Sequence, residues 1–149
     1  MNKPLLYLAA PLFNEGERSF NLRLRSIIEH KADVYLPQLD GDLIVDLIAQ
    51  GVPHEEATAQ IFHNDVGAIQ RCDIFLAVLN GRTIDEGVAF ELGVAWCLRK
   101  PCFGYKDDFR KLLVHGDNPM IERAIRKIFQ SETELADWLE DNDMCRTTT

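Results

Sequence analysis

The sequence lacks the features that mark several classes of protein. Its four cysteines form no CxxC pair, and no Cys/His cluster or HExxH segment occurs, so we expect structural thiols and no metal site. The apolar runs, such as residues 74–79, are far shorter than the roughly 20 residues that cross a bilayer. No run of Lys and Arg occurs, and 24 acidic against 16 basic residues give a net charge of −8. Nucleic acid and membrane surfaces are therefore not expected as partners.

Signatures of common enzyme sites are also missing. The loop after the first apolar run contains neither GxGxxG nor GxxxxGK[ST], which excludes a Rossmann dinucleotide site and a P-loop. No GxSxG elbow is present, which argues against triad hydrolysis. The first four residues show none of the zones of a signal peptide, so we expect a cytoplasmic protein. With 46% hydrophobic and 27% charged residues, we expect residues 1–149 to form a single domain, frayed after about residue 140.

Short apolar runs alternate with helical patterns, which predicts an α/β fold. Strands are predicted over residues 5–10, 33–37, 74–79 and 102–105. Helices are predicted over 15–29, 53–72, 86–99 and 119–129, with a short helix before residue 53 and a last one capped by Ser131 and Glu134. Residues 38–42 are expected to form a turn-rich loop. Because continuous apolar strands need cover on both faces, we predict a doubly wound, mostly parallel sheet with ligands at the carboxyl ends of its strands.

Two carboxylates fall on the apolar faces of predicted helices. Glu91 lies three residues after Val88 and four before Ala95, and both of these belong to the buried stripe of their helix. Asp65 occupies the same kind of position in the helix predicted over residues 53–72. Both carboxylates therefore point inward, where an ionised acid is costly unless it is hydrogen-bonded, paired or used in chemistry.

Asp85 adds a third acid near the same sheet edge, and two interpretations are open. Each acid could be satisfied by backbone amides or by a tyrosine hydroxyl, and Asp85 could simply be the N-cap of the helix that starts at Glu86. Alternatively, paired carboxylates in a cleft suit glycosyl transfer, which needs one nucleophile and one proton donor. The place of Glu91 near a helix N-terminus favours its ionised, nucleophilic form.

Four segments resemble, in order and spacing, the nucleoside 2-deoxyribosyltransferase family. They are YLAAPLF at residues 7–13, ND at 64–65, DEGVAFELG at 85–93 and DNPMI at 117–121. The DxGxxxELG element is the most specific of the four. The resemblance covers residues 5–139 and implies a flavodoxin-like fold with a sheet of about five strands. It also implies exchange of the base of a 2′-deoxyribonucleoside through a covalent deoxyribosyl-glutamate.

The resemblance further implies roles for individual residues. Glu91 matches the nucleophile, Tyr7 matches a phenol that orients it, and Asp65 and Asp85 match acids that transfer a proton near the base. Asp85 and Asn118 match positions that bind the sugar hydroxyls, with Asn118 supplied by a neighbouring subunit of a homo-oligomer. No cofactor is implied, and the partners are a small-molecule deoxynucleoside and a free nucleobase. Further substrate contacts are implied at Ala10, which stands where many members have glycine, and at Phe13, Gln38, Asp40 and Gly87.

Two other functions remain open at this point. An N-glycoside hydrolase on the same scaffold would use water in place of the acceptor base, and a related branch hydrolyses deoxynucleoside 5′-monophosphates. The first loop carries Glu15 and Glu17, whose charges would repel a phosphate, so we favour nucleosides over nucleotides. A nucleoside-binding module without turnover would not need three retained acids.

Overall fold

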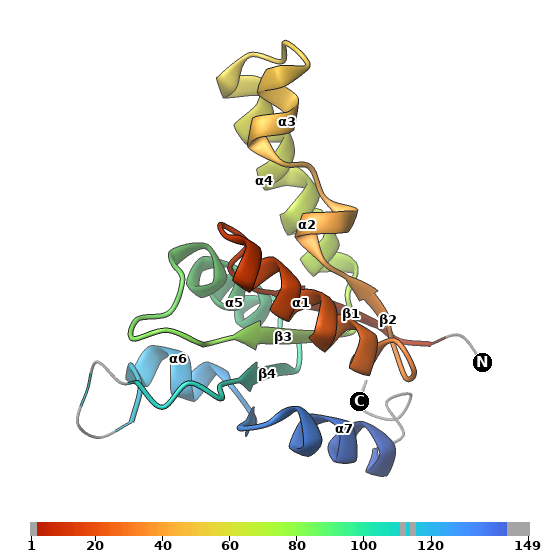
Figure 1. The fold of residues 1–149 in the computed structure, drawn as a ribbon, viewed down its shortest axis with the longest axis vertical. Coiled ribbons are helices and arrows are strands. Elements are labelled where there is room, and N and C mark those ends of the chain that lie inside the picture. Colours follow the sequence, from red (N-terminus) through yellow and green to blue (C-terminus); the bar gives the residue numbers. More distant parts are fainter. Residues whose placement is uncertain (1–2, 111–112, 114–115, 143–149) are drawn as a thin grey trace.

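The protein forms a five-stranded, all-parallel sheet in the order β2-β1-β3-β4-β5, which is a flavodoxin-like arrangement and confirms the predicted fold class (Figure 1). The structure is a computed structural model and describes residues 3–110, 113 and 116–142. The strands are β1 (Leu5–Ala9), β2 (Asp33–Tyr35), β3 (Ile74–Val78), β4 (Cys102–Tyr105) and β5 (Ile128–Phe129). The helices are α1 (Glu15–Ile28), α2 (Pro37–Asp40), α3 (Ile44–Ala49), α4 (His54–Arg71), α5 (Glu86–Cys97), α6 (Pro119–Ala124) and α7 (Glu132–Asp141).

Alternation along β1 sends its side chains to two different helical layers. Leu6 and Leu8 belong to a core cluster that includes buried residues of α1 and α7. Tyr7 and Ala9 belong to a second cluster that includes buried residues of α4 and α5. Both layers are needed because every residue of the neighbouring strand β3 is buried. The alternation therefore places the Tyr7 side chain on the face of the sheet that α4 and α5 cover.

The predicted helix over residues 119–129 is wrong in its second half. Helix α6 ends at Ala124, and Ile128 and Phe129 form the edge strand β5, which pairs with Gly104 and Tyr105 of β4. Phe129 packs on the α1 and α7 side, whereas Ile128 packs against the opposite cluster. The alternation of Ile128 and Phe129 between the two faces has the period of a strand. Together with Ile121, however, the same two residues also fit the apolar stripe of a helix, so the sequence pattern was ambiguous.

Residues 38–42 are also more ordered than the predicted loop, because Pro37–Asp40 form the short helix α2. The short helix predicted before residue 53 is present as α3. The remaining predicted helices agree with the structure within one or two residues at their ends, and Ser131 caps α7 by accepting the Glu134 N–H at 3.1 Å. The residues after 142, where fraying was predicted, lie outside the described part of the chain.

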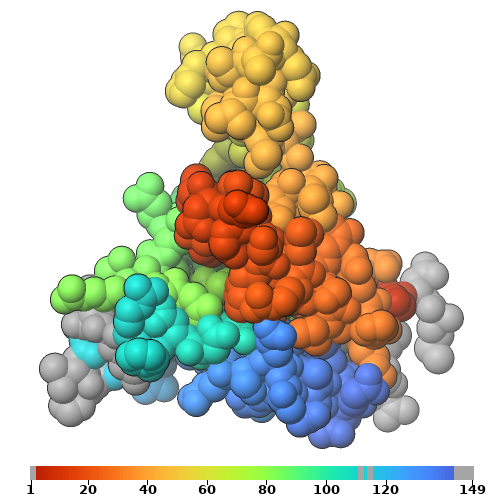
Figure 2. Space-filling model, in the orientation of Figure 1, coloured from red at the N-terminus to blue at the C-terminus, as the bar shows by residue number. Residues whose placement is uncertain are grey.

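Helix α3 and the first half of α4 project beyond the sheet as an arm (Figures 1 and 2). The two helices pack mainly on each other, with Leu47 and Ala57 buried between them. In the second half of α4, Ala68 and Ile69 rejoin the core. Where the arm leaves the sheet, Phe62 is 51% exposed. In the described part of the chain, no helix has the length and apolar character needed to cross a membrane.

Candidate active site

Glu91 of α5 reaches the sheet through a hydrogen bond with Tyr7 of β1. The Tyr7 hydroxyl donates to Glu91 Oε1 at 2.7 Å, across 84 residues of sequence. The Tyr7 side chain is fully buried, and its ring stacks between those of Tyr35 and Phe75, with centroids at 5.3 and 5.5 Å. A phenol held this rigidly fixes one carboxylate oxygen of Glu91 and leaves the other for a different contact.

Asp65 of α4 is held in the same way by a tyrosine from the neighbouring strand. The Tyr35 hydroxyl donates to Asp65 Oδ1 at 3.2 Å. Tyr35 and Tyr7 are register partners in the parallel pair β1–β2, so their rings lie side by side on one face of the sheet. Two phenol–carboxylate pairs thus lie next to each other. Each of the two acids accepts a hydrogen bond from a tyrosine hydroxyl, which is one of the interpretations that the sequence left open.

Both carboxylates line one hollow of about 390 Å³ between α4 and α5. Most of the other lining residues are apolar, and they include Phe62 and Phe90, whose ring centroids are 5.9 Å apart. Gly87 of the predicted site also lines the hollow. A cavity of this size, largely apolar with two convergent acids, is typical of a small-molecule site.

The hollow changes the protonation of both acids. Burial raises the pKa of Glu91 from 4.5 to about 7; the hydrogen bond from Tyr7 opposes this, and the charges of Asp65 and Asp85 add to it. Burial likewise raises the pKa of Asp65 from 3.8 to about 6, against the hydrogen bond from Tyr35 and with the help of Asp42. Burial and the two carboxylates raise the pKa of Tyr7, so it stays a hydrogen-bond donor. Acids with raised pKa values in a cleft are candidates for general acid and nucleophile.

Asp85 serves as the N-cap of α5. Its Oδ2 accepts the Val88 N–H at 3.0 Å, as the structural interpretation of this residue proposed. Its charge nevertheless acts on Glu91, because it contributes to the raised pKa of that carboxyl. Asp85 is therefore near the nucleophile candidate. Among the residues that the structure describes, however, it is not one of those that line the hollow of Glu91 and Asp65.

The predicted contacts from the first loop lie on the α1 side of the molecule. Ala10 is 7% exposed and packs in the cluster that α1 covers. Phe13 is 76% exposed, and its N–H donates to Glu17 Oε2 at 2.8 Å. Neither residue lines the hollow of Glu91 and Asp65.

Gln38 and Asp40 are occupied by contacts with α1. Gln38 Oε1 accepts from Asn21 Nδ2 at 2.8 Å, and Asp40 Oδ2 accepts from the Leu36 N–H at 2.8 Å and from Arg25 at 3.2 Å. The helical turn of α2 directs both side chains toward α1. The sequence offered no sign of this turn, because these residues fit a loop equally well.

Asp42, which has no distinguishing feature in the sequence, is the acid of this segment that acts on Asp65. Its Oδ2 accepts from Gln60 Nε2 and from Asn64 Nδ2, both at 2.8 Å, and its charge raises the pKa of Asp65. In the sequence, no feature distinguishes Asp42 from Asp40, since both lie in the same polar stretch. Tyr35 was missed for a similar reason, because in the sequence it is one apolar position of a short strand.

Asn118 is the N-cap of α6, and its Oδ1 accepts the Met120 N–H at 2.9 Å. It is exposed and does not line the hollow of Glu91 and Asp65 in this protomer.

Among the residues that the structure describes, no group of three or more His, Cys, Asp or Glu side chains is placed to hold a metal ion.

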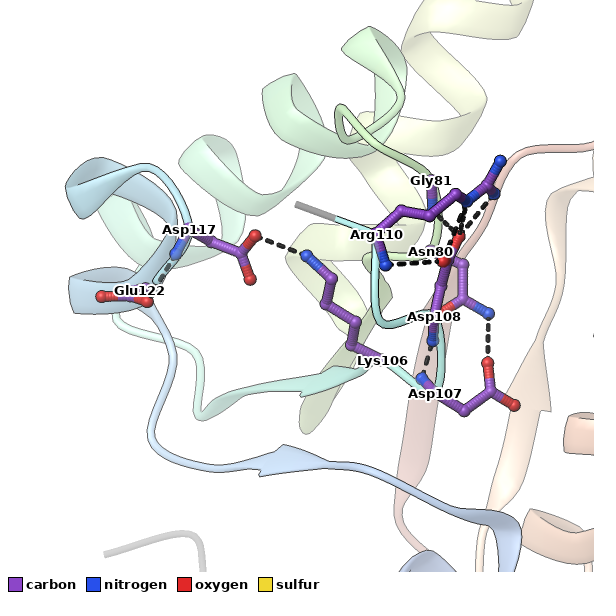
Figure 3. Close-up of polar contacts among 8 residues, drawn as sticks. All are labelled: Asn80, Gly81, Lys106, Asp107, Asp108, Arg110, Asp117 and Glu122. Atoms are coloured by element: carbon purple, nitrogen blue, oxygen red, sulfur yellow. Dashed lines mark hydrogen bonds and ion pairs between the residues drawn. The ribbon is translucent and has the colours of Figure 1, made fainter. Parts of the chain in front are cut away.

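A second hollow of about 390 Å³ lies at the carboxyl ends of β4 and β5 and is lined mainly by paired charges. Lys106 forms an ion pair with Asp117, and Arg110 pairs with Asp108 (Figure 3). Asp107 accepts from Asn80 Nδ2 at 2.7 Å. The hydrogen bonds from Arg110 lower the pKa of Asp108 well below its usual range, so this acid is held ionised.

Comparison with known proteins identifies the family. The sequence model of the family described as nucleoside 2-deoxyribosyltransferase matches residues 6–143, which is most of the chain. The chain belongs to the nucleoside 2-deoxyribosyltransferase family. This family contains transferases and hydrolases of N-glycosidic bonds, and its members act on nucleosides and nucleobases. A search of curated proteins found no match.

Three solved structures share the fold of this deoxyribosyltransferase-family chain. A conserved protein from Enterococcus faecalis V583 is 24% identical, with a TM-score of 0.74 over 93% of this chain and 98% of its own. A 2-deoxyribosyltransferase from Bacillus psychrosaccharolyticus is 22% identical, with a TM-score of 0.70 over 89% and 90%. A CMP N-glycosidase from Clostridium botulinum is 20% identical, with a TM-score of 0.56 over 91% and 98%. At these identities the likeness concerns the fold, and the reaction has to be argued from the site.

Proposed function

We propose that this protein is a nucleoside 2-deoxyribosyltransferase that exchanges the base of 2′-deoxyribonucleosides through a covalent intermediate on Glu91. The observation that carries the proposal is the pair of acids in one apolar hollow, each with one oxygen fixed by a tyrosine hydroxyl. Such a pair supplies the nucleophile and the proton donor that retaining glycosyl transfer requires. Membership of the family supports the same reaction.

In the first step, the free oxygen of ionised Glu91 forms a bond to the anomeric carbon while the bond from that carbon to the base nitrogen breaks. The bonding electron pair goes to the base, and protonated Asp65 gives its proton to the base, which improves the leaving group. Positive charge develops on the sugar in the transition state, and the Glu91 carboxylate stabilises it before the bond forms. Tyr7 keeps the carboxylate oriented by donating to Oε1.

In the second step, a nitrogen of the incoming base attacks the anomeric carbon and Glu91 departs as a carboxylate. Asp65 accepts the proton that the incoming base loses. Two inversions restore the original configuration, and the cycle needs no cofactor. In this proposal Asp85 and Asn118 bind the sugar hydroxyls, Gly87 borders the substrate inside the hollow, and Phe13 and Ala10 border the part of it that extends outside.

A nucleoside suits the first loop better than a nucleotide does. The backbone amides at the N-terminus of α1 are one place where a phosphate could bind. The Glu17 carboxylate already accepts the N–H groups of Phe13 and Asn14, at 2.8 and 3.3 Å, and Asn14 in turn accepts the Glu17 N–H at 2.9 Å. This capping box satisfies the amides and places a negative charge where the phosphate would bind.

We also propose that the active unit is a homo-oligomer in which Asn118 completes the site of a neighbouring subunit. Asn118 lies outside the hollow of its own protomer, and three large apolar side chains on α5 and α6 are exposed, Phe90 by 55%, Trp96 by 61% and Met120 by 81%. Mixing inactive Glu91→Ala with inactive Asn118→Ala protein should restore activity, because a mixed oligomer contains a site with Glu91 from one subunit and Asn118 from the other. If the subunits exchange and the mixture stays inactive, the proposal of a site shared between subunits is wrong.

The proposed reaction is tested by incubating the purified protein with a 2′-deoxynucleoside, with and without a second free base, and following all products by chromatography. We expect a new deoxynucleoside only when the second base is present, together with a deoxyribosyl adduct on Glu91 detected by intact-protein mass spectrometry. Release of base and deoxyribose at a rate that added base does not change would identify a hydrolase instead. Saturable binding without any turnover would identify a binding module.

A further inference from the structure

Tyr35 takes part in an arrangement that copies the Tyr7–Glu91 pair. It lies on β2 next to Tyr7, with the two rings stacked at an angle of 20°. Its hydroxyl donates to Asp65 Oδ1 at 3.2 Å, as Tyr7 donates to Glu91 Oε1 at 2.7 Å. The sheet therefore presents two donors from neighbouring strands to two carboxylates from different helices.

The chain segment over this pair leaves room for it only because residue 41 is glycine. A Cβ at Gly41 would lie 2.8 Å from the Pro37 carbonyl oxygen, 3.2 Å from the Tyr35 hydroxyl and 3.3 Å from Asp65 Oδ1. The φ of Gly41 is −101°, which any residue can adopt, so conformation does not require glycine at this position. The lack of space requires it, because the loop after α2 passes directly over the hydrogen bond between Tyr35 and Asp65 and leaves no room for a Cβ.

We propose that Tyr35 is a positioning residue that holds Asp65 Oδ1 and thereby presents Oδ2 as the oxygen that exchanges its proton with the base. The inference rests on the proposed function and assigns to Tyr35 the part in proton transfer that Tyr7 has in nucleophilic attack. Within the described residues, Asp65 Oδ2 accepts no hydrogen bond, and Asp65 lines the hollow next to Glu91. The proton leaves Oδ2 for the departing base and returns to it from the incoming base.

The charged and titratable groups around Asp65 determine the direction of the effect. Asp42 in the loop after α2, Glu91 on α5 and Tyr7 on β1 interact with Asp65, and of these the Asp42 charge raises its pKa. Tyr35 on β2 opposes that increase through its hydrogen bond. Removal of the hydroxyl should therefore raise the pKa of Asp65 further above 6.

Two other charges act on Tyr35 itself. Asp40 raises the pKa of Tyr35, and Arg71 of α4 lowers it, but burial and the Asp65 charge dominate and keep the phenol protonated. Tyr35 thus remains a donor over the whole pH range in which Asp65 titrates. No change in Tyr35 ionisation is needed for its role.

The test is Tyr35→Phe, which keeps the stacked ring, compared with Tyr105→Phe as the matched control. Tyr105 is also buried, on β4, and donates to a carboxylate, Asp107 Oδ2, at 3.0 Å. For base exchange we expect Tyr35→Phe to lower kcat about tenfold with KM changed less than about twofold, because proton transfer contributes to the chemical step. Because the higher pKa of the coupled pair belongs to Glu91, raising the pKa of Asp65 should move the alkaline limb of the pH–rate profile up by only about 0.1 to 0.3 pH unit. Tyr105→Phe should change neither.

A substrate that needs no proton separates this role from a structural one. In 7-methyl-2′-deoxyguanosine the base already carries a positive charge, so its departure does not depend on Asp65. With this substrate, release of 7-methylguanine by Tyr35→Phe should return to within about twofold of the wild-type rate. A loss of the same size with both substrates, or an alkaline limb that moves down, would overturn the positioning role. An active wild-type protein with Tyr35→Phe indistinguishable from Tyr105→Phe overturns this inference alone, whereas an inactive wild-type protein overturns the proposed function and the inference together.

Discussion

The hollow of Glu91 and Asp65 and the hollow beside β4 and β5 have the same volume, about 390 Å³, but their acidic side chains contact different kinds of partner. In the hollow between α4 and α5, Glu91 and Asp65 meet tyrosine hydroxyls and apolar side chains, and their pKa values rise to about 7 and about 6. In the hollow beside β4 and β5, Asp117 and Asp108 meet Lys106 and Arg110. An acid is available for chemistry near neutral pH where neutral donors hold it, whereas the hydrogen bonds from Arg110 hold the pKa of Asp108 well below its usual range.

The largest expected difference between the hollows is in activity. Glu91→Ala should lower base exchange by at least about 1,000-fold, because it removes the nucleophile. Asp107→Asn, in the paired hollow, should change the rate less than about threefold, although it loses one of the two hydrogen bonds that Asp107 accepts from Asn80 and Tyr105. Steady-state assays of both purified variants, checked for folding by circular dichroism, make the comparison. Comparable losses in the two would mean that the hollows do not divide the work in this way.

The pH dependence of exchange should report the two raised acids. The reaction needs one proton on the pair, located on Asp65 with Glu91 ionised. Because Glu91 has the higher pKa, this is the less populated of the two singly protonated forms, and the coupled acids titrate as a unit. Since their pKa values are about 7 and about 6, the rate should rise with pH toward about 6.5 and fall at higher pH. A profile of kcat/KM from pH 4.5 to 9 measures both limbs. A rate that keeps rising through pH 8 would rule out a protonated carboxyl as the general acid.

The stability of the fold should depend on Glu91 with a sign opposite to that of an ordinary paired acid. Because its folded pKa lies above its unfolded value of 4.5, the folded state binds the proton more tightly between pH 4.5 and 7. The free energy of unfolding therefore falls as pH rises through that window. Glu91→Gln removes the charge and should be more stable than the wild type at pH 8 by about 1–3 kcal/mol, with little difference at pH 4. Thermal unfolding at the two pH values measures this, and a less stable variant at pH 8 would contradict the raised pKa.

The smallest effect is expected from breaking the ion pair of the other hollow. The Lys106 side chain is 9% exposed and that of Asp117 is 22% exposed, so Lys106→Met leaves a half-buried carboxylate without its cation. We expect a loss of about 1–2 kcal/mol in the free energy of unfolding at pH 7. Urea unfolding measures it, with Lys31→Met, which breaks the more exposed pair with Glu140, as the matched control. Equal losses in both variants would show that burial adds nothing to the Lys106 pair.

The sequence predicted the elements whose patterns are local and continuous. The apolar strands β1, β3 and β4 and the long helices α1, α4 and α5 were predicted nearly to their ends, and the parallel, doubly wound arrangement followed from them. The sequence failed at β5 and α2, where short segments fit more than one period or carry no period at all. Two to four residues cannot specify their own conformation, and pairing with Gly104 and Tyr105 decides it for β5.

For the candidate site, the sequence by itself determined that Glu91 and Asp65 point inward, because the helical period that buries Val88 and Ile69 also places these acids on the same faces. The tertiary structure decided what they meet. Tyr7 is 84 residues from Glu91, and Tyr35 is 30 residues from Asp65, and only the register of β1 with β2 stacks the two phenols beside the acids. It also decided that Asp42, and not Asp40, acts on Asp65, since α2 turns Asp40 toward Arg25. A repeating pattern encodes the direction of a side chain, whereas the partner of that side chain depends on how distant segments pack together.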